Sequence, residues 1–386
     1  MAPQVENLAG EDTAVSSPVD FDHIRLRVGN AKQAAFWFCA SLGFEPFAYK
    51  GLETGSKELT AHAVKIGRII LVLEGTTVPD NKNFGDYLTK HGDSVKDVAF
   101  EVDNLEVFLE HARAKKTRIV REMTVESDEN GTVKSASILA FGDVIHTLIE
   151  RKNYRGLFLP GFRKHHWDGQ CFENMPKTNV NTIDHFVGAQ KEDEMESVVE
   201  WYEDNLLFHR YWTDGPEYIT TENSALSAKF EASENEKIQI VVAKGNEALG
   251  KGTNQIQEFV NYNGGPGVQH VALNTDDLVA TVEALRARGV ELLDVPAKYY
   301  ELVREKLSTS NCPIEADIDR LQELGIFIDF DEKGYILQKF TRPLDDRPTL
   351  FFEFIERHNF KGFGAGNFKA IFEAIERQQI TRNTFF

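Results

Sequence analysis

Two histidines and one glutamate carry the clearest chemical signal in this sequence: His185, His270 and Glu353. Each lies in a short run of β-branched and aromatic residues, which is typical of a half-buried strand. Two neutral imidazoles and one carboxylate bound to one side of a metal ion leave its opposite side open. Such a site suits Fe(II) that must hold a chelating substrate and dioxygen together, so the residue types predict an oxygen-using iron centre.

An internal duplication supports this ligand set, because a single histidine on an apolar strand is more often a hydrogen-bonded core residue than a metal ligand. Residues 21–24 match 183–186, residues 96–100 match 269–273, and residues 147–151 match 353–357. At the three candidate ligand positions the first copy has His23, Asp97 and Thr147. We therefore expect only the second copy to bind the metal.

The same comparison separates two neighbouring glutamates in the second copy. Glu356 matches Glu150 of the first copy, so its carboxylate is interpreted as structural. Glu353 matches Thr147 and is acidic in the second copy alone. Glu353 is therefore the predicted ligand.

The composition and charge are typical of an intracellular globular enzyme. We expect the protein to be cytoplasmic. The chain has 386 residues, 41% of them hydrophobic, and a net charge of −18. This charge argues against nucleic acid or an anionic membrane surface as a partner. The three cysteines have no close spacing and suggest no disulfide framework. Residues 1–18 lack the basic start and apolar run of a signal peptide, and no stretch is long enough to span a membrane.

The elements that must position the ligands recur in both halves. Short strand patterns alternate with two helical patterns in each half, which predicts tandem βαβββ modules in an α+β fold. Such open sheets bury their apolar faces by forming two barrel-like domains around a pocket. We expect a disordered tail at 1–18, an N-terminal domain without metal at 19–155, a linker at 156–177 and a catalytic domain at 178–386. A charge-rich stretch from Ser308 to Asp331, with a helical pattern near 318–324, separates the last two ligands.

Four longer motifs carry a family resemblance: QIQEFV at 255–260, NGGPGVQH at 263–270, DRPTLFFE at 346–353 and GFGAGNF at 362–368. Together with the weaker similarity of the N-terminal half, they make the chain resemble the 4-hydroxyphenylpyruvate dioxygenase family of the vicinal-oxygen-chelate superfamily, which has a glyoxalase-like fold. The resemblance covers nearly the whole chain.

This resemblance implies an oxygenase whose substrate carries its own α-keto acid. The keto acid would chelate Fe(II) held by the three ligands, and 4-hydroxyphenylpyruvate and O₂ would become homogentisate and CO₂, a step in tyrosine and phenylalanine breakdown. It also implies a homodimer built through the N-terminal half.

The resemblance further implies a set of substrate-binding residues, made of amides and aromatic rings. Amides can hydrogen-bond an oxygen-rich substrate without adding charge beside the metal, and rings pack against an aryl group. The expected residues are Gln255, Gln269, Gln338, Phe340, Phe351, Phe363, Asn367 and Phe368. The glycines at 362–366 are interpreted as the hinge of a C-terminal gate helix, running from about Asn367 to Gln378, that closes the pocket.

One region departs from the family pattern. Where the family has a serine facing the substrate, this chain has Ala228, and residues 241–248 replace a family segment of the form Pro-x-Asn-Glu-Pro. Asn246 could take the place of the missing asparagine if the loop shifts. Loss of a buried polar contact costs about 1 kcal/mol or more, so the substrate could differ from that of the family.

Three functions therefore remain open. The first is the dioxygenase that makes homogentisate, and the second is a relative that oxidises another α-keto acid or makes hydroxymandelate, which the altered region favours and Phe340 opposes. The third is a metal-binding scaffold without catalysis. Product identity separates the first two, and absence of O₂ consumption with any aryl keto acid would indicate the third.

Overall fold

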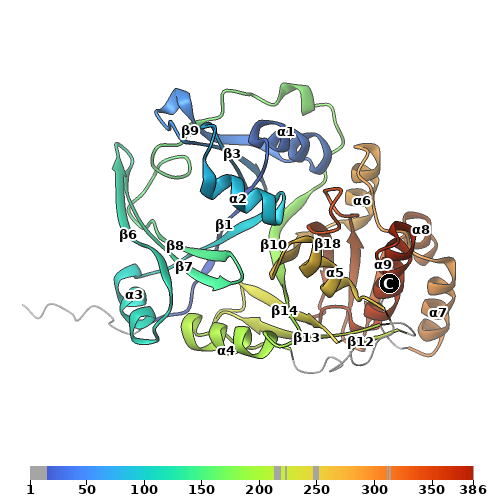
Figure 1. Cartoon of the computed structure of the whole chain (residues 1–386). Coiled ribbons are helices and arrows are strands. Elements are labelled where there is room, and N and C mark those ends of the chain that lie inside the picture. The colour runs from blue at the N-terminus through green and yellow to red at the C-terminus, as the bar shows by residue number, and fades with distance from the viewer. Residues whose placement is uncertain are drawn as a thin grey trace, which may run out of the picture.

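Two nine-stranded sheets, one in each half of the chain, form the fold (Figure 1). The computed structural model describes residues 15–212, 219–221, 224–246, 252–310, 312 and 314–385. Strand order is β6-β7-β8-β5-β1-β4-β3-β2-β9 in the first sheet and β11-β13-β14-β10-β15-β18-β17-β16 in the second, where β12 pairs beside β13.

The first half is an alternation of strands and short helices. In chain order its elements are β1 (Asp20–Arg27), α1 (Ala31–Leu42), β2 (Glu45–Lys50), η1 (Leu52–Thr54), β3 (Leu59–Ile66), β4 (Ile69–Thr76), α2 (Lys82–His91), β5 (Ser94–Glu101), α3 (Leu105–Ala114), β6 (Ile119–Asp128), β7 (Gly131–Phe141), β8 (Val144–Glu150), β9 (Arg163–Lys164) and η2 (Gln170–Phe172).

The second half repeats this order with additional helices. Its elements are β10 (Val180–Gln190), α4 (Met195–Leu206), β11 (His209–Arg210), β12 (Ile219–Thr220), β13 (Ala225–Ala232), β14 (Gln239–Gly245), α5 (Gln255–Tyr262), β15 (Gly267–Thr275), α6 (Leu278–Ala287), α7 (Ala297–Ser308), α8 (Ile318–Leu324), β16 (Phe327–Phe330), β17 (Tyr335–Phe340), β18 (Phe351–His358) and α9 (Ala365–Arg382).

Strand pairing shows the duplication directly. In the first sheet β1 pairs antiparallel with β5 and parallel with β4, while β5 pairs parallel with β8. In the second sheet β10 pairs antiparallel with β15 and parallel with β14, while β15 pairs parallel with β18. The predicted α+β fold of tandem βαβββ modules is therefore confirmed.

The expected boundaries divide the chain near these two sheets. Of the expected N-terminal tail, residues 1–14 lie outside the described residues, whereas Ser17 is buried and accepts a hydrogen bond from the Glu234 N–H at 3.4 Å. The expected linker includes β9, which pairs with β2 at the edge of the first sheet. The division of the chain into domains stays a prediction.

An insertion distinguishes the second half from the first. Two helices, α7 and α8, separate α6 from β16, whereas α3 of the first half leads directly into β6. The helical pattern expected near 318–324 is confirmed as α8, but α7 was not predicted. The last helix, α9, is longer at both ends than the expected gate helix. Within the described part of the chain, no helix has the length and apolar character needed to cross a membrane.

A shared apolar core joins the two halves, and a buried histidine bonds across it. Phe100 of β5 and Phe186 of β10 lie in one continuous core cluster. His146 on β8 donates from Nδ1 to the Val98 carbonyl at 2.8 Å, so Nε2 is the acceptor for the Tyr202 hydroxyl of α4 at 2.7 Å. Burial lowers the pKa of His146 to about 4. The contact between halves therefore requires neutral His146.

This contact predicts a loss of stability in mild acid. Below about pH 6.5 the unfolded chain binds a proton at His146 that the folded chain does not bind until about pH 4. We expect the free energy of unfolding to fall by about 1–3 kcal/mol as pH is lowered through this window. Urea denaturation at several pH values should show a smaller fall for His146→Gln. Parallel curves for the two proteins would contradict the assignment.

Candidate metal centre

Three adjacent strands of the second sheet carry the predicted ligands. His185 on β10 pairs in register with Ala272 on β15, which pairs with Glu353 on β18. His270 lies two residues before Ala272 and so projects from the same face of β15. Ala272 places only a methyl group between His185 and Glu353. The strand register therefore leaves room for an ion among the three side chains.

The three ligand atoms converge in a buried position. One ligand atom from each residue lies within 4.8 Å of the other two. Glu353 Oε2 is 3.5 Å from His185 Nε2 and 3.4 Å from His270 Nε2. His185 and Glu353 are only 3% and 2% exposed, respectively.

Hydrogen bonds at the far side of each imidazole fix its tautomer. His185 Nδ1 lies 2.8 Å from Asp184 Oδ1, and His270 Nδ1 lies 3.0 Å from Gln269 Oε1. Both partners are acceptors, so the proton is on Nδ1 and the lone pair of each Nε2 faces Glu353. Burial also lowers the pKa of His270, which favours its neutral form. Two lone pairs beside a buried carboxylate repel one another unless a cation lies between them, so these residues fit a bound metal ion.

Asp184 and Arg357 hold His185 in this orientation. Arg357 donates from Nε to Asp184 Oδ2 at 2.7 Å and from Nη2 to Oδ1 at 2.9 Å. Burial alone would raise the pKa of Asp184, but Arg357 and His185 keep it well below the usual range. Arg357 Nη1 also donates to the carbonyl of Gly362 at 2.6 Å, at the start of the expected hinge. Asp184 is therefore a charged outer partner of the kind that orients metal-binding histidines.

The first half keeps these outer partners but lacks the ligand set. His23 Nδ1 lies 2.6 Å from Asp22, which forms an ion pair with Arg151. At the other two positions Asp97 accepts hydrogen bonds from the Thr147 N–H at 2.9 Å and the Thr147 hydroxyl at 2.6 Å. The carboxylate that could bind a metal is therefore engaged by the chain itself.

The two copies also agree on the structural glutamate. Glu150 accepts from the N–H of Leu105, the first residue of α3, at 2.9 Å. Glu356 accepts from the N–H of Leu278, the first residue of α6, at 2.6 Å. Each carboxylate satisfies a free N–H at a helix N-terminus. The interpretation of Glu356 as a structural residue is confirmed.

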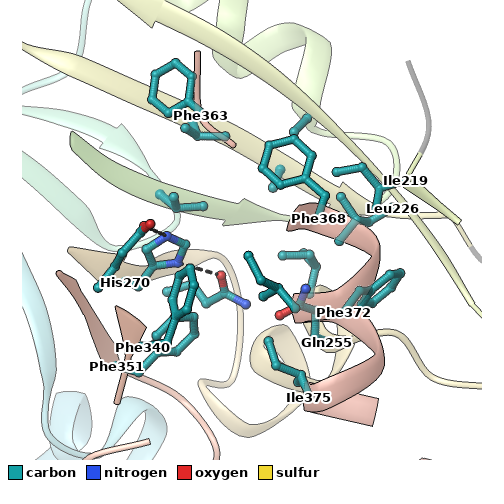
Figure 2. A pocket seen from close by; sticks show the side chains of 18 of the residues that line it. Ile219, Leu226, Gln255, His270, Phe340, Phe351, Phe363, Phe368, Phe372 and Ile375 are labelled. Atoms are coloured by element: carbon teal, nitrogen blue, oxygen red, sulfur yellow. Dashed lines mark hydrogen bonds and ion pairs between the residues drawn. The ribbon is translucent and has the colours of Figure 1, made fainter. Parts of the chain in front are cut away.

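A cavity of about 100 Å³ adjoins the ligands. Figure 2 shows it extending from His270 towards Gln255 and Ile375, with Phe368 and Phe372 of α9 along one side. The lining includes all three ligands and most of the expected substrate-binding residues: Gln255, Gln269, Gln338, Phe340, Phe351, Phe363 and Phe368. The three candidate ligands and seven of the eight expected substrate-binding residues therefore line the same cavity.

Aromatic rings pack directly on the ligand imidazoles. The Phe351 ring stacks on His270 with centroids 4.6 Å apart, and the Phe363 ring meets His185 edge-on at 5.0 Å. These rings restrict both imidazoles and keep the metal end of the cavity apolar between its few polar groups.

Asn367 is placed differently from the other expected residues. It is not among the residues lining the cavity and is 1% exposed. Its Nδ2 donates to Gln338 Oε1 at 2.9 Å, and Gln338 Nε2 donates to Glu353 Oε1 at 2.8 Å. The structure therefore places Asn367 behind Gln338, where its contact with the cavity is indirect.

Two alanines form part of an apolar wall of the cavity. Ala228 on β13 pairs in register with Ala243 on β14, and both line the cavity. Asn246 does not line it, and its N–H donates to the Ala225 carbonyl at 2.9 Å. Glu247 and Ala248 lie outside the described residues. Within the described lining, β13 and β14 contribute only apolar side chains.

Several functional residues were missed from the sequence. Asp184 and Arg357 could have been found, since the duplication repeats both as Asp22 and Arg151. The other missed residues are apolar and share no chemical signal: Val187, Ile219, Leu226, Phe230, Val241, Ala243, Ile256, Ile371, Phe372 and Ile375 line the cavity.

Comparisons with known proteins agree with this geometry. A model of the Glyoxalase/Bleomycin resistance protein/Dioxygenase superfamily matches residues 20–142 and 182–338. A 4-hydroxyphenylpyruvate dioxygenase of Caenorhabditis briggsae is 50% identical, with 98% of this chain and 96% of the relative covered. One from Danio rerio is 47% identical, covering 97% and 94%. A mutant of 4-hydroxymandelate synthase from Streptomyces coelicolor superimposes with a TM-score of 0.81 at 29% identity, covering 94% of this chain and 99% of that one.

The outer partner of His185 gives a testable prediction. Asp184→Asn removes the charge that orients the imidazole, and loss of such a partner weakens metal binding by roughly 10- to 100-fold. Asp22→Asn is the matched control, because it changes the equivalent carboxylate in the half without the ligand set. Calorimetric titration of the metal-free proteins with Co(II) should show the loss in the first variant alone. Equal affinities for the two variants would refute this role.

Proposed function

The chain belongs to the 4-hydroxyphenylpyruvate dioxygenase family of the glyoxalase/dioxygenase superfamily, and on that premise we propose that it converts 4-hydroxyphenylpyruvate and O₂ to homogentisate and CO₂. The observation that carries the proposal is the convergence of His185, His270 and Glu353 at one end of a largely apolar cavity. We further propose that the protein acts as a cytoplasmic homodimer.

Fe(II) is the proposed metal. His185 Nε2, His270 Nε2 and Glu353 Oε2 would hold it, since these three atoms point to one position. When bound, Fe(II) supplies coordination of the α-keto acid group and the redox chemistry that activates O₂. Three protein donors leave positions for both the substrate and O₂.

The protein's own contribution is orientation and exclusion of water. Gln255 and Gln269 offer neutral hydrogen-bonding groups along the cavity, and Phe340 and Phe351 provide faces for the aryl ring. Helix α9 covers the cavity with Phe368, Phe372 and Ile375 (Figure 2). Such a cover keeps water from the reacting groups and fixes the ring relative to the ligands.

A second candidate product is hydroxymandelate, because the wall formed by Ala228 and Ala243 lacks polar groups. Phe340, which also lines the cavity, and the two dioxygenase relatives favour homogentisate. The identity of the product decides between them.

The first prediction from this proposal concerns turnover. After anaerobic loading with Fe(II) and 4-hydroxyphenylpyruvate, addition of O₂ should yield homogentisate, identified by mass spectrometry. His185→Ala removes a ligand and should abolish the product, whereas His23→Ala removes the equivalent histidine of the first half and should retain it. Hydroxymandelate as the product would replace the proposal with the second candidate, and no turnover with any aryl keto acid would indicate a scaffold.

The second prediction concerns the apolar wall. Ala228→Ser adds a hydroxyl that an unsubstituted ring would leave buried without a partner, whereas an oxygen-bearing ring could bond to it. We expect the ratio of kcat/KM for 4-hydroxyphenylpyruvate to that for phenylpyruvate to rise about 10-fold, equivalent to about 1.4 kcal/mol. Ala228→Cys is the control of similar size. If both variants keep the parent ratio, Ala228 does not face the ring.

A further inference from the structure

We propose that Tyr299 is a positioning residue: through Asn367 and Gln338 it orients the metal ligand Glu353, and it makes that orientation depend on closure of α9. The inference rests on the proposed metal site but not on the identity of the substrate. It also assigns a role to the insertion that contains α7 and α8.

The insertion is in the right place for such a role. It lies in sequence between His270 and Glu353. Among its described residues, 15–177, the first half has no such insertion, no ligand set and no equivalent of α9. Figure 1 shows α7 and α8 at the outer side of the second half, next to α9. The insertion therefore accompanies the two features that only the second half has.

Its contacts hold the first turn of α9. Asp329 Oδ2 on β16, the strand that follows the insertion, accepts from the Gly366 N–H at 2.8 Å, and Lys306 of α7 donates to Asp329 Oδ1 at 3.1 Å. A Cβ at Gly366 would lie 2.2 Å from Asp329 Oδ1, so only glycine allows this approach. The backbone at the start of α9 is therefore bonded to Asp329, which Lys306 of the insertion contacts in turn.

A chain of directed hydrogen bonds then runs from α7 to the metal ligand. The Tyr299 hydroxyl lies 2.6 Å from Asn367 Oδ1, Asn367 Nδ2 donates to Gln338 Oε1 at 2.9 Å, and Gln338 Nε2 donates to Glu353 Oε1 at 2.8 Å. The Tyr299 hydroxyl also accepts from the Ile328 N–H at 2.8 Å and lies 2.8 Å from the Ile328 carbonyl. We call this chain of bonds the relay; its four side chains are those of Tyr299, Asn367, Gln338 and Glu353. They are between 1% and 8% exposed, so water has little access to replace a lost bond.

The direction of each bond matters because an amide accepts at one end and donates at the other. A hydroxyl donated to Asn367 Oδ1 turns Asn367 Nδ2 towards Gln338, and this turns Gln338 Nε2 towards Glu353. Glu353 Oε1 is then occupied, which leaves Oε2 facing both imidazoles. Gln338 Nε2 also donates to the Phe363 carbonyl at 3.2 Å, which helps to hold the Gln338 amide. Without the Tyr299 hydroxyl, Asn367 Oδ1 loses its donor, and the bond to Gln338 Oε1 is then the relay bond that holds the Asn367 amide. A rotated Asn367 amide would set two acceptors against each other at Gln338 Oε1.

The relay also couples the docking of α9 to metal binding at Glu353. Asn367 belongs to α9, so movement of that helix away from the cavity would remove the Asn367 contact with Gln338. Because coupling between two equilibria is reciprocal, metal binding at Glu353 should in turn favour the docked position of α9. A residue with a merely structural role in α7 would not produce this coupling.

The neighbouring tyrosine provides a matched control. Tyr300 is fully buried, and its hydroxyl lies 2.8 Å from the Ile326 carbonyl, to which it donates, and 3.1 Å from the Leu321 carbonyl. Tyr299→Phe and Tyr300→Phe therefore each delete one buried hydroxyl of α7 that bonds to the backbone of the segment from α8 to β16. Only Tyr299 contacts Asn367.

The test measures metal affinity and helix docking rather than turnover. Full-length metal-free proteins are titrated with Co(II), and hydrogen exchange of the backbone amides in α9 is followed with and without Co(II). We expect Tyr299→Phe to weaken Co(II) binding about 10-fold and to reduce the protection that Co(II) confers on α9. Tyr300→Phe should stay within about twofold of the parent protein in affinity.

A second variant tests the relay if Tyr299→Phe affects folding. Asn367→Leu removes both amide bonds at similar size, and addition of Tyr299→Phe to it should cause no further loss of affinity, because the two changes act on one chain of bonds. Additive losses, equal losses in the two tyrosine variants, or unchanged Co(II) affinity in Tyr299→Phe would each overturn the proposal. Failure to form homogentisate would contradict the proposed function and leave this inference standing.

Discussion

Repulsion among three electron-rich atoms is the constraint on which the second half of the structure depends. His185 Nε2, His270 Nε2 and Glu353 Oε2 meet in a buried position where water cannot screen them. A cation relieves that repulsion, but the side chains must be held together before the cation binds. The bonds to Asp184, Gln269 and Gln338 supply this preorganisation, since each fixes the outer side of one ligand.

The first half shows what the fold requires in the absence of that site. It keeps the strand pairing, the Asp22–His23–Arg151 arrangement and the capping role of Glu150. Its remaining two positions hold Asp97 and Thr147, and the Asp97 carboxylate accepts hydrogen bonds from Thr147. The aspartate–histidine–arginine arrangement is thus compatible with a half that has no ligand set. In the second half the same arrangement orients the candidate ligand His185.

The convergence of the three candidate ligand residues could be predicted from the sequence because residue type and strand position coincide at them. Comparison of the two copies separated Glu353 from Glu356, and the period of two along a strand placed the ligands on one face. Other parts depend on pairing between distant segments. That Ala243 faces Ala228 follows from the register of β13 on β14, which residue types do not reveal. The sequence likewise gives no sign of the role of Tyr299, because its partner Asn367 lies 68 positions away.

The small volume of the cavity makes the position of α9 important for substrate entry. Small-molecule sites usually enclose about 300–1,000 Å³, whereas this cavity is about 100 Å³. The apolar face of α9, with Phe368, Phe372 and Ile375, fills much of the space beside Gln255 (Figure 2). A bound aryl keto acid needs more room than this, so we infer that α9 moves when one enters and that the bonds holding its first turn oppose that movement. One of these bonds, from Asn367 to Gln338, leads on to Glu353, so on our proposal the free energy of docking α9 is coupled to the orientation of the candidate ligand.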